Sequence, residues 1–322
     1  MLWQLQWKKT VLRERENIMR NIFSCLLIFL LLVIYLSLPV IAEDKNAIFT
    51  IEDPAADDCG PCYYNYPTDE VFHPYEGLFD IRKMTIIDNN DKYSFKLYFT
   101  EVTDPWESKY GFSMPLIELY IDNEKGGCKE LFKDGANIKL DPNHPWNRLI
   151  KVSGWWVRVF TPRDKNDDMI NLTTNAEKFS RNIENCLVEV NENIIIMELE
   201  KKLIGDLADS YIYILVGSFD PFGYDHFRGI KKTKSLWNFS AEQNINLEYA
   251  PRVIDIILPF SRKQQEVLGS FEDEYCQIYP VKVIDKTENI ILIRKSIFYI
   301  IMVAIFSAII IINKDEIFKY NG

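Results

Sequence analysis

The stretch of the chain with the clearest chemical potential is acidic and rich in cysteine and tyrosine, and it reads Asp57-Asp58-Cys59-Gly60-Pro61-Cys62-Tyr63-Tyr64-Asn65-Tyr66-Pro67-Thr68. Its C-x-x-C spacing is the one that dithiol oxidoreductases use. A reactive thiol of that kind needs the N-terminus of a helix directly after a strand, where free amides lower the thiol pKa. The tyrosines, Asn and Pro-Thr that follow are poor helix formers and indicate extended or turn structure. We therefore interpret Cys59 and Cys62 as a local disulfide, or as two thiols that each pair elsewhere, and not as a redox centre.

Carboxylates near this stretch could bind a metal ion. Calcium takes about six to eight oxygen ligands from carboxylates and carbonyls. The spacing is not that of an EF-hand, and the alternative is a set of aspartates that cap turns by bonding their own backbone. The residues that we predict as a calcium site are Asp53, Asp57, Asp58, Asp80 and Asp122.

Histidines are too few and too scattered for a zinc site. The three are His73, His144 and His226, and two of them adjoin a proline. The sequence has no C-x-x-C-H and no paired axial candidates, which makes haem binding a weak alternative. A carboxylate pair for glycoside hydrolysis is not excluded by counting acidic residues.

The elements that must position these residues are predicted to be strands. From residue 47 to about 258, short apolar and β-branched runs alternate with Asp, Asn, Gly and Pro. The run Phe95-Lys96-Leu97-Tyr98-Phe99 alternates apolar and polar residues, which indicates one buried and one wet face. We expect an all-β domain, an antiparallel β-sandwich of jelly-roll or immunoglobulin-like type. The expected strands are residues 81–87, 93–102, 116–121, 149–160, 187–199 and 211–217, with hairpin turns expected at Asp88-Asn89-Asn90-Asp91 and at Glu192-Asn193.

Two apolar runs flank this domain. Residues 22–42 follow a basic segment and precede Glu43 and Asp44, which is the pattern of a signal peptide. Cleavage after Ala42 is predicted, with an uncleaved signal anchor as the alternative. Residues 296–313 are predicted as a transmembrane helix at the lower length limit, with the main domain outside the cell and residues 314–322 as a cytoplasmic tail. The expected order is signal 1–42, sandwich 43–260, closing segment and stalk 261–295, and membrane helix 296–313.

Composition supports an external protein. The chain of 322 residues has a net charge of −10, which argues against nucleic acid as a partner because phosphate binding needs a basic face. Asn171 and Asn238 begin sequons and are candidate glycosylation sites. Five cysteines follow the signal. If the others form disulfides in an oxidising compartment, one cysteine is left as a free thiol or forms an intermolecular disulfide.

The opening stretch continues into a series of ordered motifs that carry a resemblance. They are Phe72-His73-Pro74, Gly77-Leu78-Phe79-Asp80-Ile81, Asp104-Pro105-Trp106, Gly111-Phe112-Ser113, Leu140-Asp141-Pro142, Val152-Ser153-Gly154-Trp155, Asp220-Pro221-Phe222-Gly223-Tyr224-Asp225 and Pro251-Arg252-Val253-Ile254-Asp255. With these motifs, most of residues 50–260 resembles the C-terminal domain of glucodextranase, which recurs in archaeal amylopullulanases and cell-surface proteins. The chain differs where Cys59 and Cys62 replace a variable residue and a glycine of that pattern. Such domains are similar to family 9 carbohydrate-binding modules and to DOMON-like sandwiches.

The resemblance implies attachment to a polysaccharide or cell-envelope glycan. No counterpart of the helical catalytic domain of glucodextranase is present, so it implies binding without hydrolysis. Aromatic rings in loops stack on the flat C–H face of a sugar, and adjacent polar groups bind its hydroxyls. The predicted sugar ligands are Trp106, Trp146, Trp156, Phe222, Tyr224 and Arg228. Two alternatives remain: a structural envelope or adhesion protein that contacts other proteins, and an extracytoplasmic haem or redox module.

Overall fold

The structure is a computed structural model that describes residues 47–73, 76–166, 186–241 and 244–283. These residues belong to one compact unit, residues 46–289. The predicted signal, membrane helix and cytoplasmic tail, and the sequon at Asn171, lie outside the described residues. Within the described part of the chain, no helix is both long and apolar enough to cross a membrane.

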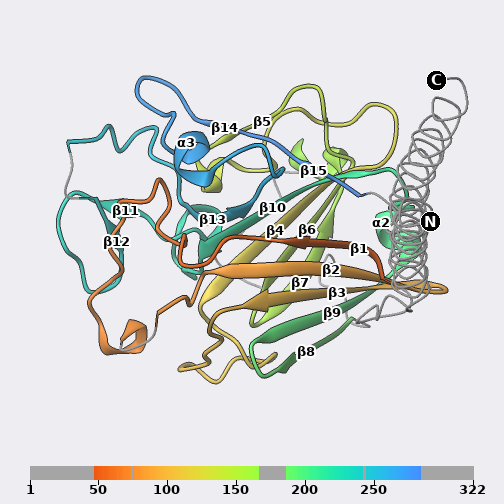
Figure 1. Ribbon diagram of the computed structural model, residues 1–322, viewed down its shortest axis with the longest axis horizontal. Coiled ribbons are helices and arrows are strands. Elements are labelled where there is room, and N and C mark those ends of the chain that lie inside the picture. The colour runs from red at the N-terminus through yellow and green to blue at the C-terminus, as the bar shows by residue number, and fades with distance from the viewer. Residues whose placement is uncertain (1–46, 74–75, 167–185, 242–243, 284–322) are drawn as a thin grey trace, which may run out of the picture. The chain divides into compact units, whose positions relative to one another are not determined.

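The fold is all-β, and its strands form two antiparallel sheets (Figure 1). The first sheet has the strand order β1-β2-β3-β9-β8. Its strands are β1 (Ala47–Glu52), β2 (Ile81–Asn89), β3 (Lys92–Phe99), β8 (Leu187–Asn191) and β9 (Ile194–Glu200). The β2–β3 hairpin turns at Asn90 and the β8–β9 hairpin at Glu192, both with the positive φ that such turns need.

The second sheet has the order β13-β10-β4-β6-β7, and β15 also pairs with β10. Its strands are β4 (Pro115–Asp122), β6 (Arg148–Ser153), β7 (Trp156–Phe160), β10 (Tyr211–Ser218), β13 (Val253–Ile257) and β15 (Val281–Lys282). Two short parallel pairs lie outside the sheets: β5 (Lys139–Leu140) with β14 (Gln277–Ile278), and β11 (Ile230–Lys231) with β12 (Phe239–Ser240).

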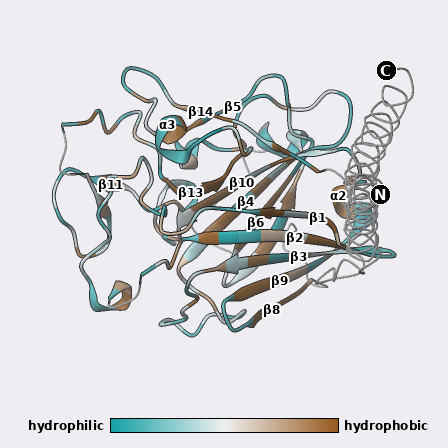
Figure 2. Cartoon of the chain, viewed as in Figure 1, coloured by the Kyte–Doolittle hydropathy of each residue, from teal (hydrophilic) through white to brown (hydrophobic). Residues whose placement is uncertain are grey.

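The main core lies between the sheets because alternate residues of their strands point to the same side. Phe95 and Leu97 of β3 share one cluster of buried side chains with Ile117 and Leu119 of β4. Figure 2 shows the hydrophobic colour concentrated along these strands and the hydrophilic colour in the loops.

A second core covers the other face of the second sheet. Leu116 and Tyr120 of β4 pack there with loop residues such as Phe132 and Trp146. Seven of the eight residues of β4 are therefore buried, since both of its faces are covered. This covering positions the candidate site, because its loops carry most of the polar residues discussed below.

Short helices complete the loops. They are η1 (Glu70–Phe72), η2 (Asp134–Ala136), η3 (Pro162–Asn166), η5 (Tyr224–His226), α2 (Lys201–Ile204) and α3 (Gln264–Leu268).

One expected strand needs correction. The expected strand at 149–160 is a hairpin of β6 and β7, so Trp155 lies in the turn and not in a strand beside Trp156. Residues 261–295 were expected to form a closing segment and a stalk. The described part of this segment packs on the domain, since β15 pairs with β10 and the Val283 N–H donates to the Ser210 carbonyl at 2.8 Å. The stalk stays a prediction.

Candidate functional site

A groove with polar and apolar walls opens among the loops that cover the second sheet. Residues of the 129–142 loop line it together with Lys165, Tyr224, Tyr275 and Gln277, and its volume is about 670 Å³. This size is in the range of sites for small ligands. Four lysines line the groove, so we call it the lysine groove: Lys129, Lys133, Lys139 and Lys165.

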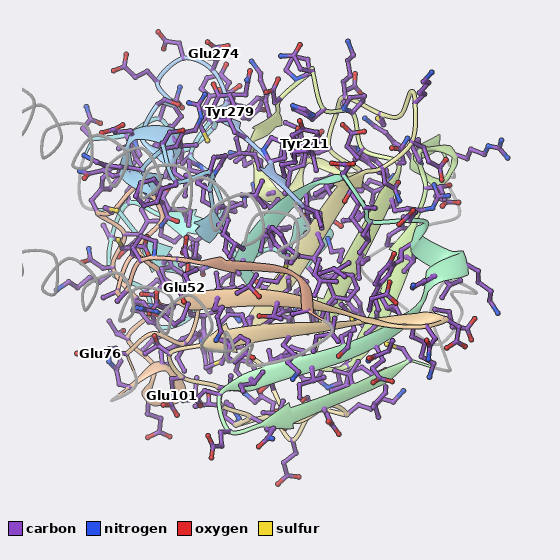
Figure 3. The ribbon with its side chains drawn as sticks, turned by 45° about the vertical axis from the view of Figure 1, so that its right-hand side comes forward. Glu52, Glu76, Glu101, Tyr211, Glu274 and Tyr279 are labelled. Atoms are coloured by element: carbon purple, nitrogen blue, oxygen red, sulfur yellow. The ribbon has the colours of Figure 1, made fainter. Side chains whose placement is uncertain are left out.

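Two tyrosines from distant segments give the groove its aromatic character. Tyr224 is 56% exposed at the start of η5. Tyr275 packs edge to face on Tyr249, with ring centroids 5.1 Å apart. Glu274, next to Tyr275, lies on the loop before β14 at the top of Figure 3. An exposed ring with hydroxyl, amide and ammonium groups around it has the chemistry to stack on a pyranose and bind its hydroxyls.

A buried ion cluster holds the loop of Tyr224 in place, and we define it as Glu118, Lys151 and Asp225. Lys151 Nζ lies 2.6 Å from Glu118 Oε1 and 2.7 Å from Asp225 Oδ1. The same ammonium donates a hydrogen bond to the Asp225 carbonyl at 2.8 Å. All three side chains are almost completely buried, so Lys151 fixes both the backbone and the side chain of the residue after Tyr224.

The backbone at this point adopts a conformation that few residues accept. Asp225 and His226 have φ values of 52° and 64°, in the left-handed region. Gly135 of η2 lies directly against this turn, because a Cβ built on it would come within 2.5 Å of the Asp225 Cβ. The loop of Tyr224 is thus in close contact with the 129–142 loop, and these two segments form walls of the lysine groove.

Burial controls the charges beneath the groove. Desolvation raises the pKa of Glu118 to about 7, while Lys151 opposes that shift and Asp225 adds to it. Burial likewise raises the pKa of Asp225, against the attraction of Lys151. Burial and the two cations Lys151 and Arg158 lower the pKa of His226 to about 3, so its imidazole is neutral at physiological pH.

A second candidate site is an acidic cluster at one end of the sandwich, defined by Asp53, Asp57 and Asp255. Each offers a carboxylate oxygen, and these atoms all lie within 4.8 Å of one another. Asp53 directly follows β1, and Asp255 belongs to β13. Gln264 brings the segments together, since its Nε2 donates to the carbonyls of Asp57 and Ile254.

The surroundings of the acidic cluster destabilise negative charge on its carboxylates. Burial, followed by repulsion from Asp57 and Asp80, raises the pKa of Asp53 to about 8, although Arg82 opposes the shift. Burial and Asp80 raise the pKa of Asp57 to about 6. Asp53 Oδ2 and Asp57 Oδ1 are buried and have no hydrogen-bond partner among the described residues. Such oxygens are stabilised by a proton or by a cation.

The other predicted calcium ligands have protein partners. Asp80 accepts hydrogen bonds from the Ala56 N–H at 3.2 Å and from Thr100, and Asp58 accepts from Tyr66 and from the Phe79 N–H at 3.3 Å. Asp122 is not part of this cluster, since its carboxylate lies 3.2 Å from His144 Nδ1.

Asp255 was not among the predicted ligands. Its side chain is completely buried and accepts from the backbone N–H groups of Ile81 and Ile256, each at 2.8 Å. An acidic residue inside the apolar run Val253-Ile254-Asp255-Ile256-Ile257 was the signal that could have identified it.

Of the predicted sugar ligands, Phe222 and Tyr224 are exposed, at 91% and 56%. Trp146 is instead completely buried, and its Nε1–H donates to the Glu130 carbonyl at 2.7 Å. Trp156 is buried under the Arg158 guanidinium, which lies 4.0 Å from its ring centroid. Rings in these positions pack the second core and do not meet a ligand from solvent.

The remaining predicted sugar ligands are Arg228 and Trp106. Arg228 is buried and donates to Ser218 Oγ at 3.0 Å and to the carbonyls of Phe219 and Trp237 at 2.6 and 2.8 Å, so its guanidinium serves the packing of loops. Trp106 is half-buried and packs against the main core. Contact of Trp106 with a sugar stays a prediction.

The five described cysteines are free thiols in the structure. Cys59 and Cys62 are hydrogen-bonded neighbours, and burial raises the pKa of both. A disulfide between them stays a prediction. At the sequon that lies within the described residues, the Asn238 side-chain amide donates to the Gly229 carbonyl at 3.1 Å.

Comparison with known proteins gives one informative result. None of the curated proteins matches the chain. A family model, described as the C-terminal binding-module, SLH-like, of glucodextranase, matches residues 48–280. That range includes the lysine groove, the acidic cluster and both sheets except β15 and the first residue of β1, and it covers more than half of the 322 residues. The chain therefore belongs to the family of glucodextranase C-terminal binding modules.

Proposed function

We propose that this protein is a non-catalytic carbohydrate-binding module of the cell surface, anchored in the membrane, and that the lysine groove is its glycan site. The family supplies the class of function. The observation that carries the choice of site is the half-exposed ring of Tyr224, held at the groove wall by a turn that the buried ion cluster fixes. A ring fixed before binding loses little conformational freedom when a sugar stacks on it.

Glu130, a carboxylate that lines the groove, is consistent with binding alone. A glycosidase needs a carboxylic acid whose pKa is raised, so that it can protonate the leaving oxygen. In this groove the ion pair with Lys165 instead lowers the pKa of Glu130. Glu130 is therefore a poor proton donor at neutral pH.

Polysaccharide pull-down and glycan-array binding of the purified chain test the proposal. Tyr224→Ala should lose binding, because the stacking surface is removed. Phe260→Ala is the matched control: Phe260 is fully exposed and does not line the groove, so its removal should leave binding intact. Equal binding by both variants, or no binding of any glycan by the parent chain, would refute this assignment.

We further propose that the acidic cluster holds a calcium ion with a structural role. Its support is the pair of buried, unpartnered oxygens on Asp53 and Asp57 beside Asp255. A divalent cation there would link the end of β1 to β13, in opposite sheets. Protonated carboxylates near Arg82 are the alternative arrangement.

Calcium titration followed by thermal unfolding distinguishes these arrangements. Calcium should raise the midpoint of the parent chain and of Asp122→Asn, because Asp122 lies with His144 and not in the cluster. Asp57→Asn should lose the response. A midpoint that is the same in calcium and in chelator would remove the metal from the proposal.

An adhesion protein is the second candidate function, and one surface feature favours it. Leu236 and Trp237 are adjacent and exposed, at 58% and 43%. Neighbouring exposed apolar side chains are typical of protein contacts. If adhesion is the function, Leu236→Ser with Trp237→Ser should abolish self-association in light scattering, and the parent chain should bind no glycan.

A further inference from the structure

We propose that the lysine groove selects an anionic glycan, one whose sugars carry carboxylate or sulfate groups. This inference rests on the proposed function and names the class of ligand for the same site. The groove lining has a positive charge, whereas the chain as a whole is negative. Four lysines and two acidic residues, Glu130 and Asp134, line the groove, whereas the whole chain has 37 basic and 47 acidic residues.

Two of the four ammonium groups are available to a ligand. Lys129 is exposed, and no described carboxylate lies within ion-pair distance of it. Lys133 Nζ donates to the Lys165 carbonyl at 3.3 Å and lies 5.6 Å from the Phe132 ring centroid. The buried carboxylate of Asp225 also attracts Lys133, but its ion-pair partner is Lys151, at 2.7 Å. Lys133 therefore keeps a positive charge that a ligand can use.

The other two lysines form ion pairs at the surface. Lys139 Nζ lies 2.8 Å from Glu274 Oε2, and both side chains are largely exposed. Lys165 pairs with Glu130, whose side chain is also largely exposed. Exposed pairs of this kind are weak, so a carboxylate or sulfate of a ligand can replace either acidic partner at little cost.

Aromatic and cationic groups thus line the same groove. Tyr224 offers a stacking surface for the ring of a sugar, and the lysines offer charge-assisted hydrogen bonds to its acidic substituent. A neutral sugar uses only the first of these contacts. An anionic sugar uses both, which is the basis of the expected selectivity.

Titration calorimetry of the full chain in a mild detergent tests this inference with three probes. Dextran is neutral, dextran sulfate has the same backbone with sulfate groups, and polygalacturonate carries carboxylates. The test variant is Lys129→Gln with Lys133→Gln. The control is Lys231→Gln with Lys232→Gln, which removes two exposed lysines that do not line the groove.

We expect at least one anionic probe to bind more tightly than dextran, and the probe that does so identifies sulfate or carboxylate as the recognised group. The groove variant should weaken that binding about tenfold or more and leave dextran unaffected. Salt of about 1 M, where the Debye length is about 3 Å, should weaken anionic binding much more than dextran binding.

The failures are distinguishable. If dextran binds as tightly as the anionic probes and Tyr224→Ala removes binding, the anionic inference fails while the glycan site stands. If the control variant loses as much anionic binding as the groove variant, the attraction is non-specific and the inference also fails. If none of the three probes binds, the anionic inference fails, and the glycan array decides whether the proposed glycan function fails with it.

Discussion

Replacement of Lys151 by methionine should be among the most damaging single changes in this domain. Methionine fills most of the space of lysine but removes the cation that Glu118 and Asp225 share at 2.6 and 2.7 Å. Removing one partner of a buried ion pair typically costs about 3–5 kcal/mol. Domain stabilities are about 5–15 kcal/mol, so the loss is a large part of the total. For a domain of this size it corresponds to a fall in thermal midpoint of roughly 6–20 °C.

The pH dependence of the loss distinguishes charge from packing. The pKa of Glu118 in the folded protein, about 7, is above its ordinary value of 4.5, and burial is the main cause. A raised carboxyl pKa contributes stability that is complete below the unfolded pKa and is lost as pH rises through the folded pKa. Lys151 lowers the folded pKa of Glu118, so without Lys151 this pKa should rise further. The variant should then lose stability over a wider pH range than the parent chain. The stability difference between Lys151→Met and the parent chain should therefore be smaller at pH 5 than at pH 8.

Thermal unfolding followed by circular dichroism, at both pH values, measures this prediction. Lys202→Met is the control, because Lys202 also pairs with a glutamate, Glu200, but is 76% exposed. An exposed pair contributes about 1 kcal/mol at most. If Lys151→Met unfolds within 1 kcal/mol of the parent chain, or if its deficit is the same at both pH values, the electrostatic reasoning is wrong.

Three further predictions concern other parts of the domain. In chelator, stability should fall as pH rises from about 5 to 8, because Asp53 and Asp57, with pKa values of about 8 and 6, retain protons that the unfolded chain releases. Each retained proton changes the free energy of unfolding by about 1.4 kcal/mol per pH unit. Saturating calcium should reduce this pH dependence in thermal unfolding. A pH dependence that calcium leaves unchanged would contradict the metal proposal. Gly135→Ala should destabilise the domain by about 1–3 kcal/mol in urea unfolding, because its Cβ would come within 2.5 Å of the Asp225 Cβ, whereas Gly229→Ala, whose nearest neighbour is at 3.8 Å, should change little. Mass spectrometry of unreduced, alkylated protein should reveal a link between the two cysteines of the Cys-Gly-Pro-Cys sequence, and full alkylation of both would exclude it.

The fold was predictable where strands have one wet face. The alternation around Phe95 identified β3 correctly, and the Asp-Asn turn before it identified the β2–β3 hairpin. The sequence from residue 149 to 160 misled because loops cover the outer face of the second sheet, so apolar residues occur on both faces of β6 and β7. Alternation then disappears, and a hairpin resembles one long strand.

The sites were predictable to the extent that their residues are close in sequence. Tyr224 was identified from its own loop, and Asp53 and Asp57 from their neighbourhood. Asp255 lies about two hundred residues further along the chain and joins them only because β13 and the start of β2 are brought together by the two sheets. Trp146 was chosen for its type, but a tryptophan in a covering loop packs inward as readily as it faces solvent.

The short strand β15 also determines how the domain would respond to mechanical load. Tension applied to the chain beyond residue 283 enters through β15, whose ladder with β10 has two residue pairs, Tyr211 with Lys282 and Ile212 with Val281. β10 itself is held to β4 by eight such pairs. Under a rising force, β15 should therefore separate from β10 first, while the ladders among the other strands of both sheets remain intact. If the protein is anchored to a surface as proposed, separation of β15 would lengthen the anchoring segment before the load reaches the groove.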